Sequence, residues 1–506
     1  MRLPFAVRSA MPTGVAALLL LVPAAPEALA QRRPARPAAA RATAARPAPT
    51  RAAERPTNVI YFVTDGFGPA SVTFAREYVH ETTGRRSLAF DPYLAVALQT
   101  WATDSRVTDS AAGGTALATG HKTYNGAIAV DTTGRVLATI LEGAKTQGMA
   151  TGMVVTSRIT HATPACFSAH VGSRAEEDEI ARQQMRLAPD VMIGGGRRYF
   201  LPTGVGDGRR RDGLNLLDSL RAKGFTVATD RAGYDRATAR PFVGLIADNH
   251  MAYEIDRVPA EEPSLAEMTT KALALLTAPP SSGRAAPAKG FFLMVEASRI
   301  DHAAHGNDAA AHLHDILAYE QAFQAALDFQ RRHPGTLIVA TSDHETGGLT
   351  LGRNLGGVGR YFWHPEVFRT ERASYDVVLP ELRAAYAADT TAAGAWRVLA
   401  DRMGLADLSA AERSALKNAM RSAPARLNGL LTEAVAQRAT IAWTTGGHTA
   451  VDVNVYAVGP GADQFRGNRP NDAMGATVAR LLGLDLAGLT ARMRLTAPVY
   501  PRGAGE

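Results

Sequence analysis

A serine at the start of a predicted helix is the first candidate for chemistry in this sequence. Ser110 follows Asp109 directly, and the next residues, 111–117, are small or aliphatic, a composition typical of a closely packed helix. The first turn of a helix has unpaired N–H groups and a positive dipole end, so it stabilises an oxyanion or a phosphate. Taken alone, however, the segment favours a plain helix cap.

Side chains that bind metals gather in four other segments, spread over nearly 400 residues. These segments are 64–66, 296–305, 343–345 and 444–449. Asp301 and His305 are spaced i, i+4, which places both side chains on one face of a helical turn. Imidazole with carboxylate favours Zn²⁺, and carboxylates with a hydroxyl favour Mg²⁺. Each residue alone would be an ordinary acid or core histidine, but together they predict a metal centre.

Short apolar runs indicate which elements must position these residues. Such runs end one to three residues before the acidic residues at 65, 296 and 343. Further candidate strands are 151–156, 191–193, 242–247 and 453–458. Unbroken apolar runs suit strands buried on both faces of a parallel sheet. Helical periodicity at 262–276 and 309–330 lies between the runs, so we expect an α/β/α layered fold around a large, mostly parallel central sheet. Ligands of such folds bind beyond the carboxyl ends of the strands.

Two regions interrupt the alternation of strands and helices. The segment 194–240 is rich in glycine and arginine and predicts loops with a short helix. The segment 352–440 separates two groups of candidate ligands and contains helical stretches of alanine, arginine and leucine. We interpret 352–440 as an accessory, crown-like subdomain inserted over the site, within one catalytic domain at 58–506.

The N-terminus predicts export. Residues 1–30 combine a basic start, an apolar core at 15–22 and a small-residue cleavage motif at 28–30, the pattern of a secretory signal peptide. The apolar core is too short for an anchoring helix. Residues 31–57 consist almost entirely of Arg, Ala, Pro and Thr and predict a disordered linker. The expected location is therefore periplasmic or secreted.

Composition excludes several classes of function. Of the 506 residues, 46% are hydrophobic, which is enough for a large core. No run of 18 or more apolar residues occurs, so no transmembrane span is expected. Residues 1–57 hold 9 Arg and 2 Glu, which account for the whole net charge of +7, and the neutral remainder predicts no nucleic-acid partner. Cys166 is the only cysteine, which excludes an internal disulfide.

Taken together, the motifs resemble those of the alkaline phosphatase family over about residues 58–458. The matching motifs are 108–112, 161–164 with 170–174, 296 with 301–305, 342–346 and 446–449. The resemblance implies a phosphomonoesterase with two Zn²⁺ ions and a third metal ion, usually Mg²⁺. Phosphate monoesters and inorganic phosphate are the implied ligands, and the chain could assemble as a homodimer.

The resemblance also implies roles for the residues around the substrate. Ser110 would be the nucleophile that forms a phosphoserine, and Arg174, held by Asp109, would clamp the phosphate. The planar guanidinium of an arginine can bind two phosphate oxygens at once, which a lysine cannot do. His161 and His302 would help to position the substrate. They stand where some family members have Asp and Lys, so the identity of the third metal stays open.

Three sets of metal ligands are implied by the same resemblance. The first zinc set is Asp301, His305 and His448. The second zinc set is Asp65, Asp343, His344 and the Ser110 oxygen. In the third set, Asp65 bridges to Thr163 and Glu296, with Mg²⁺ as the usual ion. Two cations about 4 Å apart would stabilise the attacking and leaving oxygens of an in-line displacement.

Two alternatives remain beside the phosphomonoesterase. A phosphodiesterase or sulfatase of the same superfamily would use similar metals, but the nucleophile here is a serine rather than a threonine or a modifiable Cys/Ser motif. A phosphate- or metal-binding protein that has lost catalysis belongs to a different class. The presence of Ser110, Arg174 and every expected ligand argues against that alternative.

Overall fold

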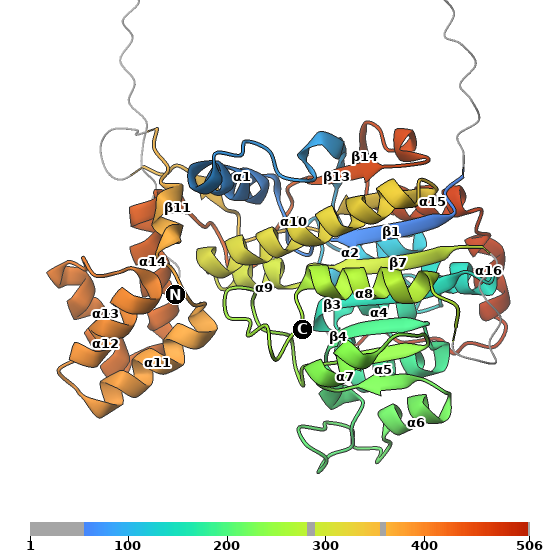
Figure 1. Ribbon diagram of the computed structural model, residues 1–506, viewed down its shortest axis with the longest axis horizontal. Helices are drawn as coiled ribbons and strands as arrows, with labels where there is room; N and C mark the ends of the chain where they lie inside the picture. The colour runs from blue at the N-terminus through green and yellow to red at the C-terminus, as the bar shows by residue number, and fades with distance from the viewer. Residues whose placement is uncertain (1–54, 281–288, 355–360, 504–506) are drawn as a thin grey trace, which may run out of the picture. The chain divides into compact units, whose positions relative to one another are not determined.

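Ten strands of the described residues form one central sheet (Figure 1). The structure is a computed structural model that describes residues 55–280, 289–354 and 361–503. The strand order is β14-β2-β13-β8-β1-β7-β3-β4-β6-β5. In that order the bounds are Asn468–Pro470, Leu94–Gln99, Val453–Val458, Thr336–Thr341, Asn58–Val63, Phe291–Glu296, Ala150–Arg158, Val191–Gly195, Phe242–Leu245 and Thr226–Ala228. Only β13 runs antiparallel to its neighbours, which confirms the predicted α/β fold with a mostly parallel sheet.

Helices cover both faces of the sheet, and β1 shows why. Ile60 and Phe62 lie in one apolar core and Val59, Tyr61 and Val63 in the other, because successive side chains of a strand point to opposite faces. The helices that pack on the first core include α1 (Pro69–Thr83), α8 (Leu265–Thr277) and α10 (Ala309–Arg332). Those that pack on the second include α2 (Ser110–Thr119), α3 (Ile140–Thr146), α4 (Ala162–Ser168), α5 (Glu177–Leu187), α6 (Leu216–Ala222) and α15 (Asp472–Leu482).

The carboxyl ends of the parallel strands meet at one edge of the sheet. Val63 of β1 is in register with Glu296 of β7 and with Thr341 of β8. Because β13 runs the opposite way, its first residue lies at this same edge, and His448 precedes it by a few residues. Segments far apart in the sequence are thereby brought to one edge, where α/β folds bind ligands.

Four helices are inserted between two paired strands. β10 (Thr350–Leu351) pairs antiparallel with β11 (Ile441–Ala442). Between them lie α11 (Tyr375–Ala388), α12 (Ala393–Met403), α13 (Ala410–Ser422) and α14 (Leu427–Ala439), which stand together to one side of the sheet in Figure 1. Their buried side chains belong to the same apolar core as those of α10. The predicted bounds 352–440 enclose these helices, and the division into domains stays a prediction.

The segment 194–240 has more regular structure than the predicted loops with a short helix. It contains α6, β5 and α7 (Arg231–Arg236). The side chain of Asn215 caps α6 by accepting from two backbone N–H groups, and that of Asp230 caps α7 in the same way. Elements of three to seven residues carry too little periodicity to be recognised from the sequence.

The remaining described elements are short. They are α9 (Arg299–His305), α16 (Leu486–Met493), β9 (Glu345–Thr346), β12 (His448–Thr449), and 3₁₀ turns at Asp91–Tyr93, Arg197–Tyr199, Pro365–Arg369, Pro424–Arg426 and Ala462–Gln464. Among the described helices none alone is long and apolar enough to cross a membrane, although the bent pair α15 and α16 reaches that length and composition together. The predicted signal peptide (1–30) and nearly all of the predicted linker (31–57) lie outside the described residues.

Candidate active site and metal centre

Ser110 is the first residue of α2 and is almost fully buried. The helix cap is Asp109, whose Oδ1 accepts from the backbone N–H of Ala112 at 2.9 Å. Ser110 is therefore not needed as a cap. Its Oγ lies 3.1 Å from Nε2 of His344, at the positive end of the helix. This placement leaves the serine oxygen available for chemistry.

The three residues of the first predicted zinc set converge. His305 Nε2 lies 3.4 Å from Asp301 Oδ2 and 3.1 Å from His448 Nε2. Tetrahedral zinc with bonds of about 2.0–2.2 Å places its ligand atoms about 3.3 Å apart. Nδ1 of His305 donates to the Gly446 carbonyl at 2.7 Å, and Nδ1 of His448 donates to the Thr108 carbonyl at 2.8 Å. Because a carbonyl oxygen only accepts, these bonds leave both Nε2 lone pairs free for a metal.

The second predicted zinc set surrounds His344. Its Nε2 lies 3.4 Å from Asp65 Oδ1, 3.4 Å from Asp343 Oδ2 and 3.1 Å from Ser110 Oγ. Its Nδ1 lies 3.2 Å from the Thr346 hydroxyl. All of these residues are buried. The serine oxygen thus lies among three side chains of the types that bind zinc.

His161 lies beside two residues of the third predicted set. A ring nitrogen of His161 lies within 4.8 Å of carboxylate oxygens of both Asp65 and Glu296. Thr163 stands two residues further on, in the first turn of α4. His161 Nε2 also lies 3.2 Å from Arg174 Nη2. When Nε2 accepts from Arg174, the neutral ring carries its proton on Nδ1 and has no lone pair left for a metal ion. The ring can therefore accept from Arg174 or bind a metal ion, but it cannot do both at once.

Buried oxygens without a hydrogen-bond partner mark the same place. They are both carboxylate oxygens of Asp65, Asp343 Oδ2, Glu296 Oε1 and Thr163 Oγ1. Burial, and then the neighbouring carboxylates, raise the pKa of Asp65 and of Asp343 well above the ordinary value. Burial also raises the pKa of Glu296 to about 7. Unpaired buried acids are costly, and divalent cations would relieve this cost. The residues present therefore fit metal ions.

Arg174 lies across an open pocket from these ligands. The pocket is lined by Asp109, Arg158, His161, Ala162, Arg174, Ala175, Glu177, His305 and His448. Arg174 Nη1 donates to Asp109 Oδ2 at 3.1 Å. The same Asp109 therefore caps the helix of Ser110 and holds the arginine, which couples the positions of the two residues.

Comparison with known proteins identifies the family. Residues 56–484 match the family model described as alkaline phosphatase. The chain belongs to the alkaline phosphatase family. It is 38% identical over 482 residues to a repressible alkaline phosphatase of Saccharomyces cerevisiae, covering 88% of this chain and 84% of that protein. This confirms the predicted resemblance and makes the chain a phosphomonoesterase with candidate metal-binding clusters.

Solved alkaline phosphatases share the fold. A cold-active alkaline phosphatase from a psychrophilic Shewanella species is 36% identical with a TM-score of 0.74, covering 84% of this chain and 99% of that one. An alkaline phosphatase of Thermus thermophilus is 33% identical with a TM-score of 0.75, covering 85% and 92%. The similarity therefore extends over nearly the whole of both solved chains.

In this alkaline phosphatase family member, His302 lies outside the three ligand sets. Its ring centroid is 5.2 Å from that of His161 and 4.4 Å from that of His250. Its Nδ1 lies 3.0 Å from Nη1 of Arg299. Burial, with the nearby Arg299 charge, lowers the pKa of His302 to about 3. Because Nδ1 accepts from Arg299, the neutral ring carries its proton on Nε2 and can donate from there, next to the ring of His161.

The sequence analysis missed three residues beside the phosphatase pocket. Arg158 forms a bidentate ion pair with Glu177 at 2.8 and 2.7 Å, and both line the pocket. The third residue is His250, whose ring contacts those of His161 and His302. Arg158 ends β3 at the carboxyl edge of the sheet, and that position was the available signal. His250 comes from a loop and carried no such signal.

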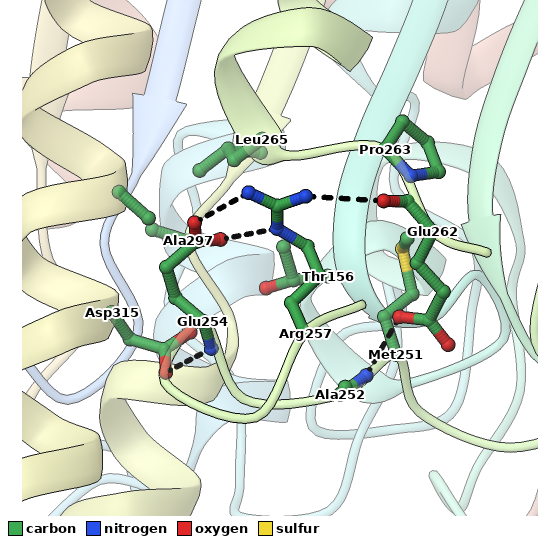
Figure 2. Close-up of a pocket in the computed structure, with 11 residues that line it drawn as sticks. Thr156, Met251, Ala252, Glu254, Arg257, Glu262, Pro263, Leu265, Ala297 and Asp315 are labelled. Atoms are coloured by element: carbon green, nitrogen blue, oxygen red, sulfur yellow. Dashed lines mark hydrogen bonds and ion pairs between the residues drawn. The ribbon is translucent and has the colours of Figure 1, made fainter. Parts of the chain in front are cut away.

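A small cavity is lined by charged groups that have partners within its own wall (Figure 2). Arg257 forms a bidentate ion pair with Glu254 at 2.8 and 2.7 Å and donates to the Glu262 carbonyl at 3.2 Å. Asp315 accepts from the backbone N–H of Glu254 at 3.2 Å. Ala297, which follows Glu296 in the sequence, is among the residues that line this cavity.

Proposed function

We propose that this phosphomonoesterase acts through a covalent phosphoserine on Ser110. The observation that carries the proposal is the position of Ser110 Oγ, 3.1 Å from His344 Nε2 at the start of α2. The serine hydroxyl loses its proton and attacks phosphorus, and the bond from phosphorus to the leaving oxygen breaks. Water then attacks the phosphoserine, which releases inorganic phosphate and restores the serine.

Arg174 binds two non-bridging phosphate oxygens in this proposal. Its guanidinium is held by Asp109 at 3.1 Å, so its orientation is set before the substrate arrives. His161 and His302, whose rings lie next to each other beside Arg174, position the substrate. A planar guanidinium fits this role because its donors match two phosphate oxygens in geometry.

The metals proposed are two Zn²⁺ ions and one Mg²⁺ ion. The first zinc set is Asp301, His305 and His448; the second is Asp65, Asp343, His344 and the Ser110 oxygen; the Mg²⁺ set is Asp65, Thr163 and Glu296. Imidazole-containing sets favour zinc, and an oxygen-only set favours magnesium. When bound, such ions supply Lewis-acid stabilisation of the attacking and leaving oxygens. The His161 ring beside the third set would favour Zn²⁺ there if it turned a lone pair toward the ion.

The organisation of the chain is proposed on the same grounds. Residues 1–30 are a signal peptide, 31–57 a linker and 58–506 the catalytic domain, with 352–440 as the accessory subdomain. The pairing of β10 with β11 supports these insertion bounds. The signal pattern supports a periplasmic or secreted location, and a homodimer is the proposed assembly.

Acid trapping tests the nucleophile. The enzyme is incubated with labelled inorganic phosphate at acidic pH, quenched, digested and mapped, with Ser110→Ala as the matched control. Label on the peptide that contains Ser110, absent from the control, is expected. Label on any other residue would refute the assignment. Parallel assays of a monoester, a diester and a sulfate ester, with and without chelator, would expose a diesterase or sulfatase.

A further inference from the structure

The last described residues of the chain are fixed to the loop at 131–136. Arg494 pairs with Asp131 at 2.6 Å, and the backbone N–H of Tyr500 donates to the Gly134 carbonyl at 2.8 Å. The Tyr500 ring packs on a small apolar cluster made of Tyr124, Ala127 and Val130. We call residues 496–502 the C-terminal tail. The tail lies beyond residue 484, where the match to the family model ends.

The tail lies directly on the backbone that carries Arg174. A Cβ added to Gly172 would stand 1.8 Å from the carbonyl oxygen of Pro501, so only glycine fits under the tail. On its other side, this backbone is held by Tyr124, whose hydroxyl donates to the Gly172 carbonyl at 3.1 Å. The segment 172–174 is thereby enclosed between the tail and the segment 124–126.

A chain of polar contacts also connects the tail to Arg174 through side chains. Arg502 pairs with Asp104, and Asp104 Oδ1 accepts from the backbone N–H of Asn125 at 3.0 Å. Asn125 Oδ1 in turn accepts from the backbone N–H of Asp109 at 2.9 Å. Asp109 Oδ2 accepts from Arg174 at 3.1 Å. Every step from Arg502 to Arg174 is an ion pair or a hydrogen bond.

The Arg502 pair itself contributes little to stability. The side chain of Arg502 is 59% exposed and that of Asp104 is 28% exposed, and solvent screens the attraction in such exposed pairs. The guanidinium also lies over the Tyr124 ring, 4.6 Å from its centroid, which fixes its orientation. Loss of the contact should therefore change the positions of Asp104 and the segment 124–126 more than the free energy of folding.

We propose that the C-terminal tail positions the phosphate clamp. One route runs from Arg502 through Asp104 and Asn125 to Asp109. The other runs from Pro501 through Gly172 to Arg174. Together they hold the two clamp residues in the geometry that binds phosphate. Arg502 is a positioning residue, since it touches no reacting atom. This inference rests on the proposed role of Arg174 as the clamp.

The experiment compares Arg502→Ala with Arg466→Ala, which removes another exposed arginine ion pair, the one with Asp463. We expect Arg502→Ala to lower kcat/KM for a phosphate monoester about threefold to tenfold, because the clamp keeps its charge but loses its alignment. The inhibition constant of inorganic phosphate should rise by the same factor, because product and substrate share the clamp. Arg502→Lys should recover only part of the loss, since an ammonium lacks the planar fork. Arg466→Ala should change neither quantity.

A double-mutant cycle separates this inference from the proposed function. In an Arg174→Ala background, Arg502→Ala should have no further effect on kcat/KM or on phosphate inhibition. If Arg174→Ala alone changes neither quantity, the clamp assignment fails. If Arg174→Ala impairs the enzyme but Arg502→Ala is silent, or costs the same in both backgrounds, the tail does not position the clamp. Unchanged melting temperatures exclude a folding defect.

Discussion

The side chain of Asn428 donates a hydrogen bond to the carbonyl oxygen of Gly306 at 2.9 Å. Gly306 follows His305, the proposed metal ligand at the end of α9, whereas Asn428 belongs to α14 of the inserted helices. Nearby, the backbone N–H of Tyr375 donates to Asp308 Oδ2 at 2.6 Å. The inserted helices therefore contact the turn that follows the proposed ligand His305.

Replacing Asn428 with alanine should speed metal loss. One net hydrogen bond is worth about 0.5–1.5 kcal/mol, which corresponds to about twofold to tenfold in a rate or equilibrium. The rate of inactivation in chelator should rise by that factor, while activity in excess zinc stays near that of the parent. Asn418→Ala, an exposed position on α13, is the matched control. Equal inactivation rates for Asn428→Ala and the parent would show that the contact does not hold the ligand turn.

Metal removal should abolish activity and lower the melting temperature. The carboxylates of Asp65, Asp343 and Glu296 are buried close together. Cations that bind to the folded state stabilise it by mass action. Zn²⁺ with Mg²⁺ should restore both properties, and Ca²⁺, a larger ion with a preference for oxygen ligands, should restore little. The measurements are activity, melting temperature and metal content on one sample. Full activity after exhaustive removal would eliminate the proposed mechanism.

The sheet, and the meeting of the candidate ligands at one of its edges, were predictable because both leave strong local signals. Each unbroken apolar run became a strand buried on both faces, and the acidic residues that follow those strands meet at the carboxyl edge. The i, i+4 spacing of Asp301 and His305 became a helical turn with both side chains on one face. In each case the prediction depended on residues close together in the sequence, because hydrophobic periodicity is a property of such short windows.

The remaining features depend on contacts that sequence spacing does not encode. His161 lies near Asp65 and Glu296 because separate strands end at one edge of the sheet. For the same reason His250, in a loop, contacts His302. The local sequence around Ser110 favoured this serine as the helix cap, but Asp109 caps α2. The Gly172–Pro501 contact joins residues more than 300 positions apart. Such long-range packing has no local pattern.

Arg174→Ala should impair the enzyme without inactivating it. The change removes charge-assisted hydrogen bonds worth about 1.5–3 kcal/mol each, so kcat/KM should fall about tenfold to a hundredfold or more. Inorganic phosphate should inhibit the variant less, and Arg174→Lys should recover little because an ammonium cannot bind two oxygens in a plane. If kcat/KM and the phosphate inhibition constant both stay within about twofold, under half a kcal/mol, Arg174 does not bind phosphate.

The buried pair of His170 and Glu142 should make stability depend on pH away from the active site. His170 Nε2 lies 2.9 Å from Glu142 Oε1, and the side chains are 8% and 14% exposed. Burial opposes the charge on His170, but the Glu142 carboxylate outweighs it, so the histidine pKa is raised. For Glu142, burial is outweighed by His170 and by hydrogen bonds from Thr139, so its pKa is lowered.

The signs of these shifts define a window. A raised histidine pKa contributes stability that is complete below its ordinary value of 6.5 and is lost as pH rises through the folded value. A lowered glutamate pKa contributes stability that is complete above its ordinary value of 4.5 and is lost as pH falls. The pair should therefore stabilise the protein most between about pH 4.5 and 6.5, and less as the pH falls below or rises above this window.

Glu142→Gln tests this window, because glutamine keeps an acceptor for the backbone N–H of Thr139 in the α3 capping box and removes only the charge. The parent should exceed the variant in melting temperature near pH 6, by the equivalent of about 1–2 kcal/mol, and the gap should narrow toward pH 9. His170→Gln should remove the same dependence, and the double variant should add nothing further. A gap that stays constant from pH 6 to pH 9 would mean that His170 carries no proton when paired with Glu142.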